Sequence, residues 1–299
     1  MFTIIPKNSV APVRVVIVPA SALLRSRKRS LAASNQISVP VLANTFPRAG
    51  LVAAGARPFV WTGGKATLVM VGDHIDKGPR SVAVIEALMQ IEASADAQGG
   101  AVLVLAGNHE AEFFANPLSD KFTKDDGIDR ELRAMTPSLD PVQFATGLDP
   151  RAAWMRARPL AARVGDLFFC HAGDSHGATV DGLRAELLDA FRTGGGFRDD
   201  RVIGSGSPLE SREWYTPGVV AKNAAALGVT RIVFGHDPSA FERGKIVAPG
   251  DYQGHLIKID AGLGAGDSDG EILHVFHADR GEVGEAIGPK GAPRRLFGP

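Results

Sequence analysis

The apolar residues of the chain gather in short blocks, and four of these blocks are each followed at once by a polar loop. Uninterrupted apolar runs of this length are typical of strands buried on both faces of a sheet. Between the first two blocks, Pro79 opens a stretch with apolar residues at helical spacing and Gly99 closes it, which predicts a crossover helix between parallel strands. The predicted strands are Thr67–Val71, Val102–Leu105, Leu167–Cys170 and Ile232–Phe234.

Residues 111–162 break this pattern. They are polar, are interrupted by prolines and lack the alternation of a strand. Since the strand pattern returns at residues 163–170, the stretch is expected to be a helical cap inserted between two core strands.

The two ends of the chain differ from its middle. Residues 1–47 form an atypical N-terminal segment in which Val13–Val18 is one possible strand, and residues 48–287 are expected to form the main domain. The tail 288–299 is rich in Pro, Gly and basic residues, which predicts disorder.

Near the C-terminal end of the main domain, Gly218–Leu227 predicts a short helix ended by Gly228. Two apolar stretches, Leu256–Ile259 and Ile272–Phe276, predict short strands that form a hairpin or an edge pair.

Composition excludes several functions. The 33 basic and 33 acidic residues balance, so there is no overall basic footprint for nucleic acid. No apolar run approaches the roughly 18–20 residues of a membrane span, so a membrane partner is not expected. Cys170 is the only cysteine, which rules out an intrachain disulfide and fits a reducing, cytoplasmic location.

The loops that follow the four predicted strands carry a carboxylate, an amide and two imidazoles. Such groups at strand carboxyl ends are what a dinuclear metal site needs, and mixed nitrogen and oxygen ligands suit Mn, Fe, Zn or Co. Metal-assisted hydrolysis of a phosphoester is therefore the first hypothesis. The loops are Gly72-Asp73-His74-Ile75-Asp76-Lys77-Gly78, Gly107-Asn108-His109-Glu110, His171-Ala172-Gly173 and Gly235-His236.

Taken in order, these loops resemble those of the phosphoprotein phosphatase family of calcineurin-like metallophosphoesterases, and the bacterial-type Shewanella-like branch is nearest. The resemblance runs from about Arg48 to Gly264 and includes the segments Ser207–Trp214 and Ile259–Gly262. It implies an α/β fold with a two-layered mixed β-sheet core flanked by helices. It also implies a hydrolase that acts on phosphorylated proteins or small phosphoesters, most often a serine/threonine phosphatase.

The family pattern assigns roles to residues. It implies that Asp73 bridges two divalent metal ions, commonly manganese, and that the second ion is completed by Asn108, His171 and His236. A metal-bound hydroxide would attack phosphorus. His109 matches the general acid that protonates the leaving group, and Asp76 matches the carboxylate that orients it.

Two cationic residues match phosphate-binding positions. Arg212 matches a phosphate-binding arginine, and Lys77 stands where the family has a second arginine. Because lysine keeps the charge but loses the bidentate fork of arginine, weaker binding of phosphate is expected at Lys77.

The first family motif, Gly-Asp-x-His-Gly, is missing. Residues 1–72 contain no Asp, Glu or His, so the first metal has neither its own carboxylate nor its imidazole there. Three explanations stay open: a frameshifted N-terminal sequence, a degenerate pseudo-phosphatase that binds phosphate without cleaving it, or a targeting peptide. Among the remaining polar residues, Asp174 and His176 are the best substitutes for the missing ligands, whereas His74 is expected to fill a turn.

Substrate choice is also open, because the cap would set it. A nucleotide or dinucleotide polyphosphate hydrolase is the alternative within the enzyme class. Sequencing the coding DNA across codons 12–50 tests the frameshift: an alternative frame that encodes Gly-Asp-x-His-Gly would establish it, and the absence of such a frame would exclude it.

Overall fold

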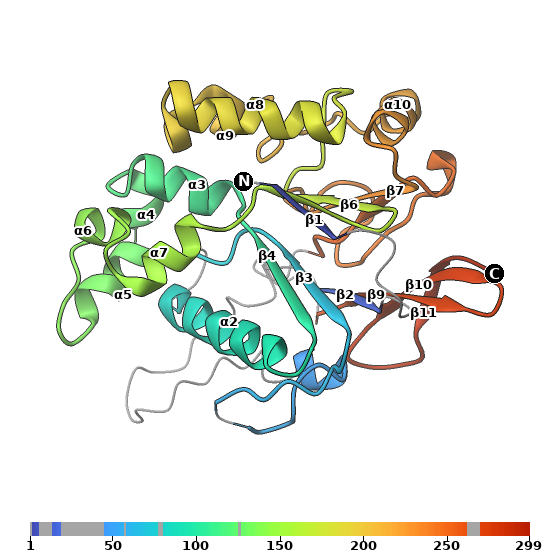
Figure 1. Ribbon diagram of the computed structural model, residues 1–299, viewed down its shortest axis with the longest axis horizontal. Helices are drawn as coiled ribbons and strands as arrows, with labels where there is room; N and C mark the ends of the chain where they lie inside the picture. The colour runs from blue at the N-terminus through green and yellow to red at the C-terminus, as the bar shows by residue number, and fades with distance from the viewer. Residues whose placement is uncertain are drawn as a thin grey trace.

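The computed structural model describes residues 2–5, 14–18, 45–56, 58–76, 80–124, 127–261 and 270–299. Two β-sheets lie face to face in these residues, with helices on the outside (Figure 1). The five-stranded sheet has the order β1-β5-β6-β7-β8, in which β6 runs parallel to β7 and β7 parallel to β8. Its strands are β1 (Phe2–Ile5), β5 (Ala161–Val164), β6 (Leu167–Cys170), β7 (Arg231–Phe234) and β8 (Leu256–Lys258).

The six-stranded sheet has the order β11-β10-β9-β2-β3-β4. Strands β2, β3 and β4 are parallel, whereas β9, β10 and β11 form an antiparallel extension at the C-terminal end of the chain. The strands are β2 (Val15–Val18), β3 (Thr67–Val71), β4 (Ala101–Leu105), β9 (Ile272–Ala278), β10 (Gly281–Ile287) and β11 (Arg294–Phe297).

Three apolar layers hold the fold together. One lies between the sheets, where Val69 and Leu105 of one sheet join Phe169 and Val233 of the other in a single buried cluster. A second lies between the outer face of the six-stranded sheet and helix α2 (Ser81–Asp96). The third covers the outer face of the five-stranded sheet with helices α8 (Val180–Thr193) and α10 (Pro217–Leu227) (Figure 1).

The stretch predicted to be a cap is helical. Two of its helices have the sequence signature of a sharp start: Asp140 and Asp149 each accept backbone N–H groups at the helix N-terminus, and each is followed by proline. The helices of this region are α3 (Asn108–Ala115), α4 (Asp120–Thr123), α5 (Ile128–Ala134), α6 (Pro141–Ala145) and α7 (Pro150–Arg156). Short helices α9 (Asp200–Ile203), η2 (Gly196–Arg198) and η3 (Gly250–Tyr252) lie elsewhere in the described part of the chain.

The four strands predicted from apolar blocks are present as β3, β4, β6 and β7, with ends within one residue of those expected. The predicted α/β fold with two sheets flanked by helices is confirmed. The predicted pairing of Leu256–Ile259 with Ile272–Phe276 is wrong, because β8 pairs with β7 and β9 pairs with β2 and β10, in different sheets.

Other differences are local. The tail expected to be disordered contains β11, which pairs with β10. The sequence interpretation also missed α8, although Leu183, Leu187 and Ala190 give it a buried stripe and Thr179 caps it. None of the helices in the described ranges is long and apolar enough to cross a membrane.

Substitution of Leu68 by Ala should lower the free energy of unfolding by about 2–5 kcal/mol, because Leu68 is fully buried between β3 and α2 and the cavity cannot fill. Urea denaturation measures this. Val60→Ala is the control, since Val60 is 44% exposed and should change stability by less than about 0.5 kcal/mol. Equal effects of the two substitutions would contradict the assigned layer.

Candidate metal centre

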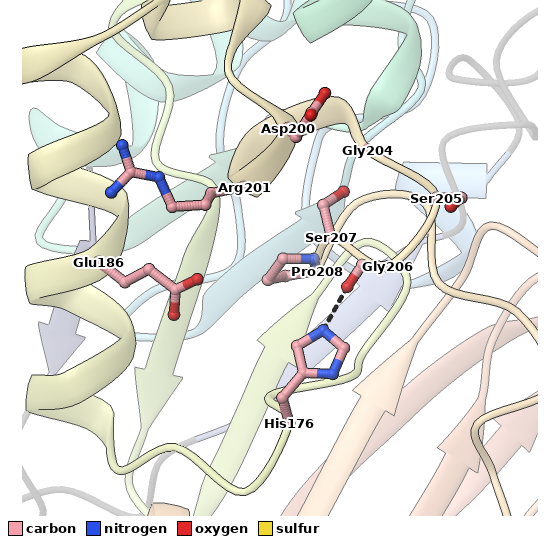
Figure 2. Close-up of a pocket in the computed structure, with 9 residues that line it drawn as sticks. All are labelled: His176, Glu186, Asp200, Arg201, Gly204, Ser205, Gly206, Ser207 and Pro208. Carbon is pink, nitrogen blue, oxygen red and sulfur yellow. Dashed lines mark hydrogen bonds between the residues drawn. The ribbon is translucent and has the colours of Figure 1, made fainter.

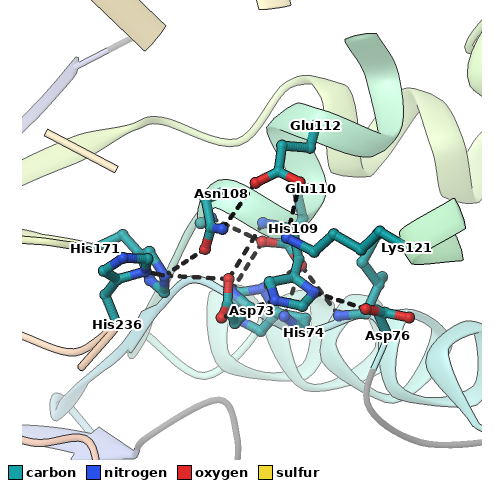
Figure 3. Close-up of polar contacts among 12 residues, drawn as sticks. Asp73, His74, Asp76, Asn108, His109, Glu110, Glu112, Lys121, His171 and His236 are labelled. Carbon is teal, nitrogen blue, oxygen red and sulfur yellow. Dashed lines mark hydrogen bonds and ion pairs between the residues drawn. The ribbon is translucent and has the colours of Figure 1, made fainter. Parts of the chain in front are cut away.

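The polar loops predicted from the sequence meet at one edge of the two sheets (Figure 3). Asp73 follows β3, and Asn108 and His109 open α3 directly after β4. His171 follows β6 in the other sheet, and His236 follows β7. Because the strands that carry these loops end at the same edge, residues up to 163 positions apart in the sequence become neighbours.

The two loops of the six-stranded sheet approach so closely that only glycine fits at two positions. A Cβ on Gly72, whose φ is +81°, would lie 2.5 Å from the Cα and N atoms of Gly107. A Cβ on Gly107 would lie 2.5 Å from the backbone N and Oδ1 of Asp73. Asp73 itself has a φ of +60°, and strained backbone of this kind is concentrated at functional sites.

Four side-chain donors converge at this edge. The Nε2 atom of His171 lies 3.1 Å from Oδ1 of Asp73, 3.1 Å from Oδ1 of Asn108 and 3.3 Å from Nδ1 of His236. All four side chains belong to buried residues. Atoms about 2.1 Å from one ion at tetrahedral or octahedral angles lie roughly 3.0–3.4 Å apart, so the spacing matches a ligand set.

The protonation of His171 supports a cation at this point. Its Nδ1 lies 2.7 Å from the carbonyl oxygen of Val71, which can only accept, so Nδ1 carries a hydrogen. In the neutral ring Nε2 then directs a lone pair at the oxygens of Asp73 and Asn108. Burial opposes a charge on His171, but Asp73, the Val71 carbonyl and Glu110 together outweigh it and raise the pKa, so the site favours a positive charge here, either a proton or a metal ion.

The donor chemistry therefore fits a divalent ion held by an aspartate, an amide oxygen and two imidazoles, with a backbone carbonyl orienting one ring. The fit depends on counting the amide oxygen of Asn108 together with the carboxylate and the two imidazoles. Counting His, Cys, Asp and Glu alone, the described ranges contain no group of three or more that could hold a metal ion.

Glu110 joins the two loops and was given no role from the sequence. Its buried carboxylate accepts backbone N–H groups from Asp73 at 2.8 Å, His74 at 2.6 Å, Ile75 at 3.0 Å and Gly107 at 2.7 Å. Burial alone would raise its pKa, but the adjacent His74 side chain and the Gly107 N–H outweigh it and hold the pKa at about 2. The available signal was the capping-box position three residues after Gly107.

His109 and Asp76 form a pair beside the donor set. Nδ1 of His109 lies 3.0 Å from Oδ2 of the fully buried Asp76, and Nε2 lies 3.7 Å from Oδ2 of Asp73. The backbone N–H of Asp76 donates to Oγ of Ser81, which fixes the loop against the start of α2. An imidazole with a buried carboxylate 3.0 Å from one nitrogen, and with the other nitrogen facing the centre, is suited to proton transfer.

The remaining predicted residues have different places. Lys77 and most of the segment expected to carry the first motif lie outside the described residues. Arg212 is half exposed, and its Nη1 lies 3.4 Å from Oδ1 of Asp237, the neighbour of His236. His74 is not a turn filler, because it is buried with Nδ1 3.7 Å from Oε1 of Glu110.

Asp174 and His176 do not join the donor set as substitute ligands. Asp174 accepts from Nδ2 of Asn223 at 2.9 Å and from the backbone N–H of His176 at 2.9 Å. His176 is directed instead toward the carbonyl oxygen of Gly206, at the wall of a separate open cavity of about 460 Å³ (Figure 2).

Two further carboxylates lie on the outer side of the donor set. Glu112 accepts from Asn108, and Oε2 of Glu210 lies 3.7 Å from Nε2 of His236. Burial and the nearby Glu112 raise the pKa of Glu210 to about 7. Burial would also raise the pKa of Glu112, but its hydrogen bonds with Glu210, Lys121 and Asn108 outweigh this and lower it to about 2. The sequence motifs gave no role to either residue.

Glu110 makes the free energy of unfolding depend on pH in the acidic range. Because its folded pKa of about 2 lies below the ordinary 4.5, the carboxylate contributes its full stability above pH 4.5 and loses it as the pH falls through 2. Between pH 7 and pH 3, Glu110→Gln should therefore lose less unfolding free energy than the wild type, measured by urea denaturation. Exposed Glu186→Gln should follow the wild type. Parallel pH curves for Glu110→Gln and wild type would contradict this role.

Comparisons with known proteins agree with the geometry. The sequence model described as calcineurin-like phosphoesterase matches residues 53–240. The chain is 37% identical over 65 residues to Shewanella-like protein phosphatase 2 of Arabidopsis thaliana, covering 22% of this chain and 16% of that protein. It is 32% identical over 111 residues to the symmetrical bis(5'-nucleosyl)-tetraphosphatase of Acidovorax ebreus (strain TPSY), covering 36% of this chain and 34% of that protein.

These matches thus span about a third or less of the length of the curated relatives. Among solved structures, the cold-active protein-tyrosine phosphatase of a psychrophilic Shewanella species superposes with a TM-score of 0.73 at 17% identity. The superposition covers 99% of this chain and 82% of that one, and it shows a shared fold. Since the family model covers more than half of the chain, the protein belongs to the calcineurin-like phosphoesterase family.

Proposed function

We propose that this protein hydrolyses phosphoesters with the help of a divalent metal ion, and that its substrates are phosphorylated serine and threonine side chains of proteins. One observation carries the proposal: donor atoms of Asp73, Asn108 and His236 lie 3.1–3.3 Å from Nε2 of His171, with the His109–Asp76 pair beside them. A metal ligand set next to a carboxylate-held imidazole suits hydrolysis of an ester with a poor leaving group.

Each residue then has a task. Asp73, Asn108, His171 and His236 would hold the ion, which supplies Lewis acidity and lowers the pKa of a nearby water. His109 gives a proton from Nε2 to the departing alkoxide, and Asp76 keeps the ring oriented and stabilises its charged form. Arg212 and Lys77 are proposed to bind the phosphoryl oxygens, as their family positions imply.

The proposal requires only one complete ligand set. The first 72 residues offer no Asp, Glu or His, and the described residues near the centre supply the four donors of a single ion. After loading with Mn²⁺ and desalting, elemental analysis should therefore find about one metal ion per chain. Two ions per chain would mean that a second ligand set exists outside these four residues, and the proposal of a single metal site would be wrong.

A second candidate is hydrolysis of dinucleoside polyphosphates. It is favoured by the match to the Acidovorax protein, which extends over 111 residues and is longer than the match to the Arabidopsis phosphatase. The third possibility is a relative that binds phosphate groups without cleaving them, which the missing first motif favours. The three differ in what they release from defined substrates.

Analysis of the products released with added Mn²⁺, both inorganic phosphate and nucleotides, separates these candidates. Peptides carrying phosphoserine, phosphothreonine or phosphotyrosine, diadenosine tetraphosphate and p-nitrophenyl phosphate should be compared. We expect release from the phosphoserine and phosphothreonine peptides and loss of release in Asp73→Asn. Nucleoside diphosphate as the main product would favour the second candidate, and turnover no higher than that of Asp73→Asn on every substrate would leave only the non-catalytic one.

The general acid has a separate signature. His109→Asn should lower kcat on phosphoserine peptides by about 10²–10⁴-fold, because the alkoxide then leaves without a proton. The loss on p-nitrophenyl phosphate should be much smaller, since p-nitrophenolate is a better leaving group. Equal losses on the two substrates would remove His109 from the proton-donor role.

A further inference from the structure

A chain of three polar side chains runs from the cap to the candidate metal centre (Figure 3). Nζ of Lys121, in α4, lies 2.8 Å from Oε2 of Glu112, in α3. The other oxygen of Glu112, Oε1, accepts from Nδ2 of Asn108 at 2.9 Å. Oδ1 of Asn108 then lies 3.1 Å from Nε2 of His171, inside the donor set.

The chemistry of these groups allows only one arrangement. A lysine ammonium can only donate, and an ionised carboxylate can only accept. Nδ2 of Asn108 therefore faces Glu112, which turns Oδ1 toward His171. Only this orientation of the amide offers an oxygen to a cation, whereas the reverse would offer an NH₂ group.

The cap holds Lys121 in place through its neighbour. Phe122 is fully buried, and its ring meets that of Phe113 edge-on with centroids 5.4 Å apart. Phe113 follows Glu112 in α3, so the same packing contact keeps α4 against the helix that carries Asn108 and Glu112. Side chains of Lys121 and Glu112 are 25% and 27% exposed, so water screens the pair only in part.

We propose that Glu112 and Lys121 are positioning residues that hold the amide oxygen of Asn108 toward the metal ion, so that the cap contributes to metal affinity. The inference rests on the proposed function, because it assumes that Asn108 is a ligand. Neither residue belongs to the four loops that indicated the family. Groups that orient ligands in this way typically change metal affinity by 10–100-fold.

Isothermal titration of Mn²⁺ into the metal-stripped full-length protein tests the proposal. Glu112→Gln keeps the shape but replaces one carboxylate oxygen with an NH₂ group, which cannot accept from Lys121 or Asn108, so the Kd for Mn²⁺ should rise about tenfold or more. Lys121→Met should raise it about two- to fivefold, the range of a partly screened ion pair. Glu186→Gln, an exposed glutamate on α8, is the matched control and should bind as the wild type does.

The double variant adds a test of the order of the chain. Because Lys121 acts through Glu112, adding Lys121→Met to Glu112→Gln should change the Kd no further. Independent, additive effects would overturn the proposal that Lys121 acts through Glu112. Wild-type Mn²⁺ affinity in both single variants would overturn it as well. If Glu112→Gln does not fold, judged by thermal unfolding without metal, Lys121→Met alone decides.

These outcomes also separate the inference from the proposed function. Absence of Mn²⁺ binding in the wild-type protein would overturn the metal-dependent function and the inference with it. Binding by the wild type with unchanged affinity in the variants would overturn the inference alone. Catalytic rates are not needed for either decision.

Discussion

The close approach of two strand-end loops is the constraint on which the candidate centre depends, and one carboxylate secures it. Glu110 accepts four backbone N–H groups, three from the loop after β3 and one from the turn after β4. Glycines at positions 72 and 107 remove the side chains that would collide. Buried N–H groups need acceptors, so the carboxylate offsets a cost that the tight turns create. An oxygen of Asp73 and an oxygen of Asn108 each lie 3.1 Å from Nε2 of His171 at this junction.

Both sheets are needed for the site. The six-stranded sheet supplies Asp73, Asn108 and His109, and the five-stranded sheet supplies His171 and His236, so the apolar layer between the sheets sets the separation of the donors. In the proposed function, the chain provides an aspartate, an amide and two imidazoles for one ion, with His109 alongside as the proton donor. The family pattern assigns a second ion further ligands, and the first 72 residues contain no side chain of the required kind.

Many of the strands and donor positions could be predicted from the sequence, because they depend on residues that are close together along the chain. The strands β3, β4, β6 and β7 are apolar blocks, and the donors follow them within three residues. Partners of β8 and β9 could not be predicted, since pairing depends on contacts distant in sequence. Glu110 was missed for the same reason: its main contacts are with N–H groups 35–37 residues away. Glu112 belongs to no recognisable sequence motif. The buried stripe of α8, by contrast, is visible in the sequence as apolar residues at helical spacing, and it was overlooked.

The central claim is that Asp73, Asn108, His171 and His236 together hold a divalent ion. Anomalous X-ray scattering from crystals grown with Mn²⁺ tests it most directly, because it locates the ion without reference to activity. The account predicts one strong anomalous peak at about 2.1 Å from the carboxylate oxygen of Asp73, the amide oxygen of Asn108 and a ring nitrogen of each histidine. A peak elsewhere, or none at this edge of the sheets, would contradict it.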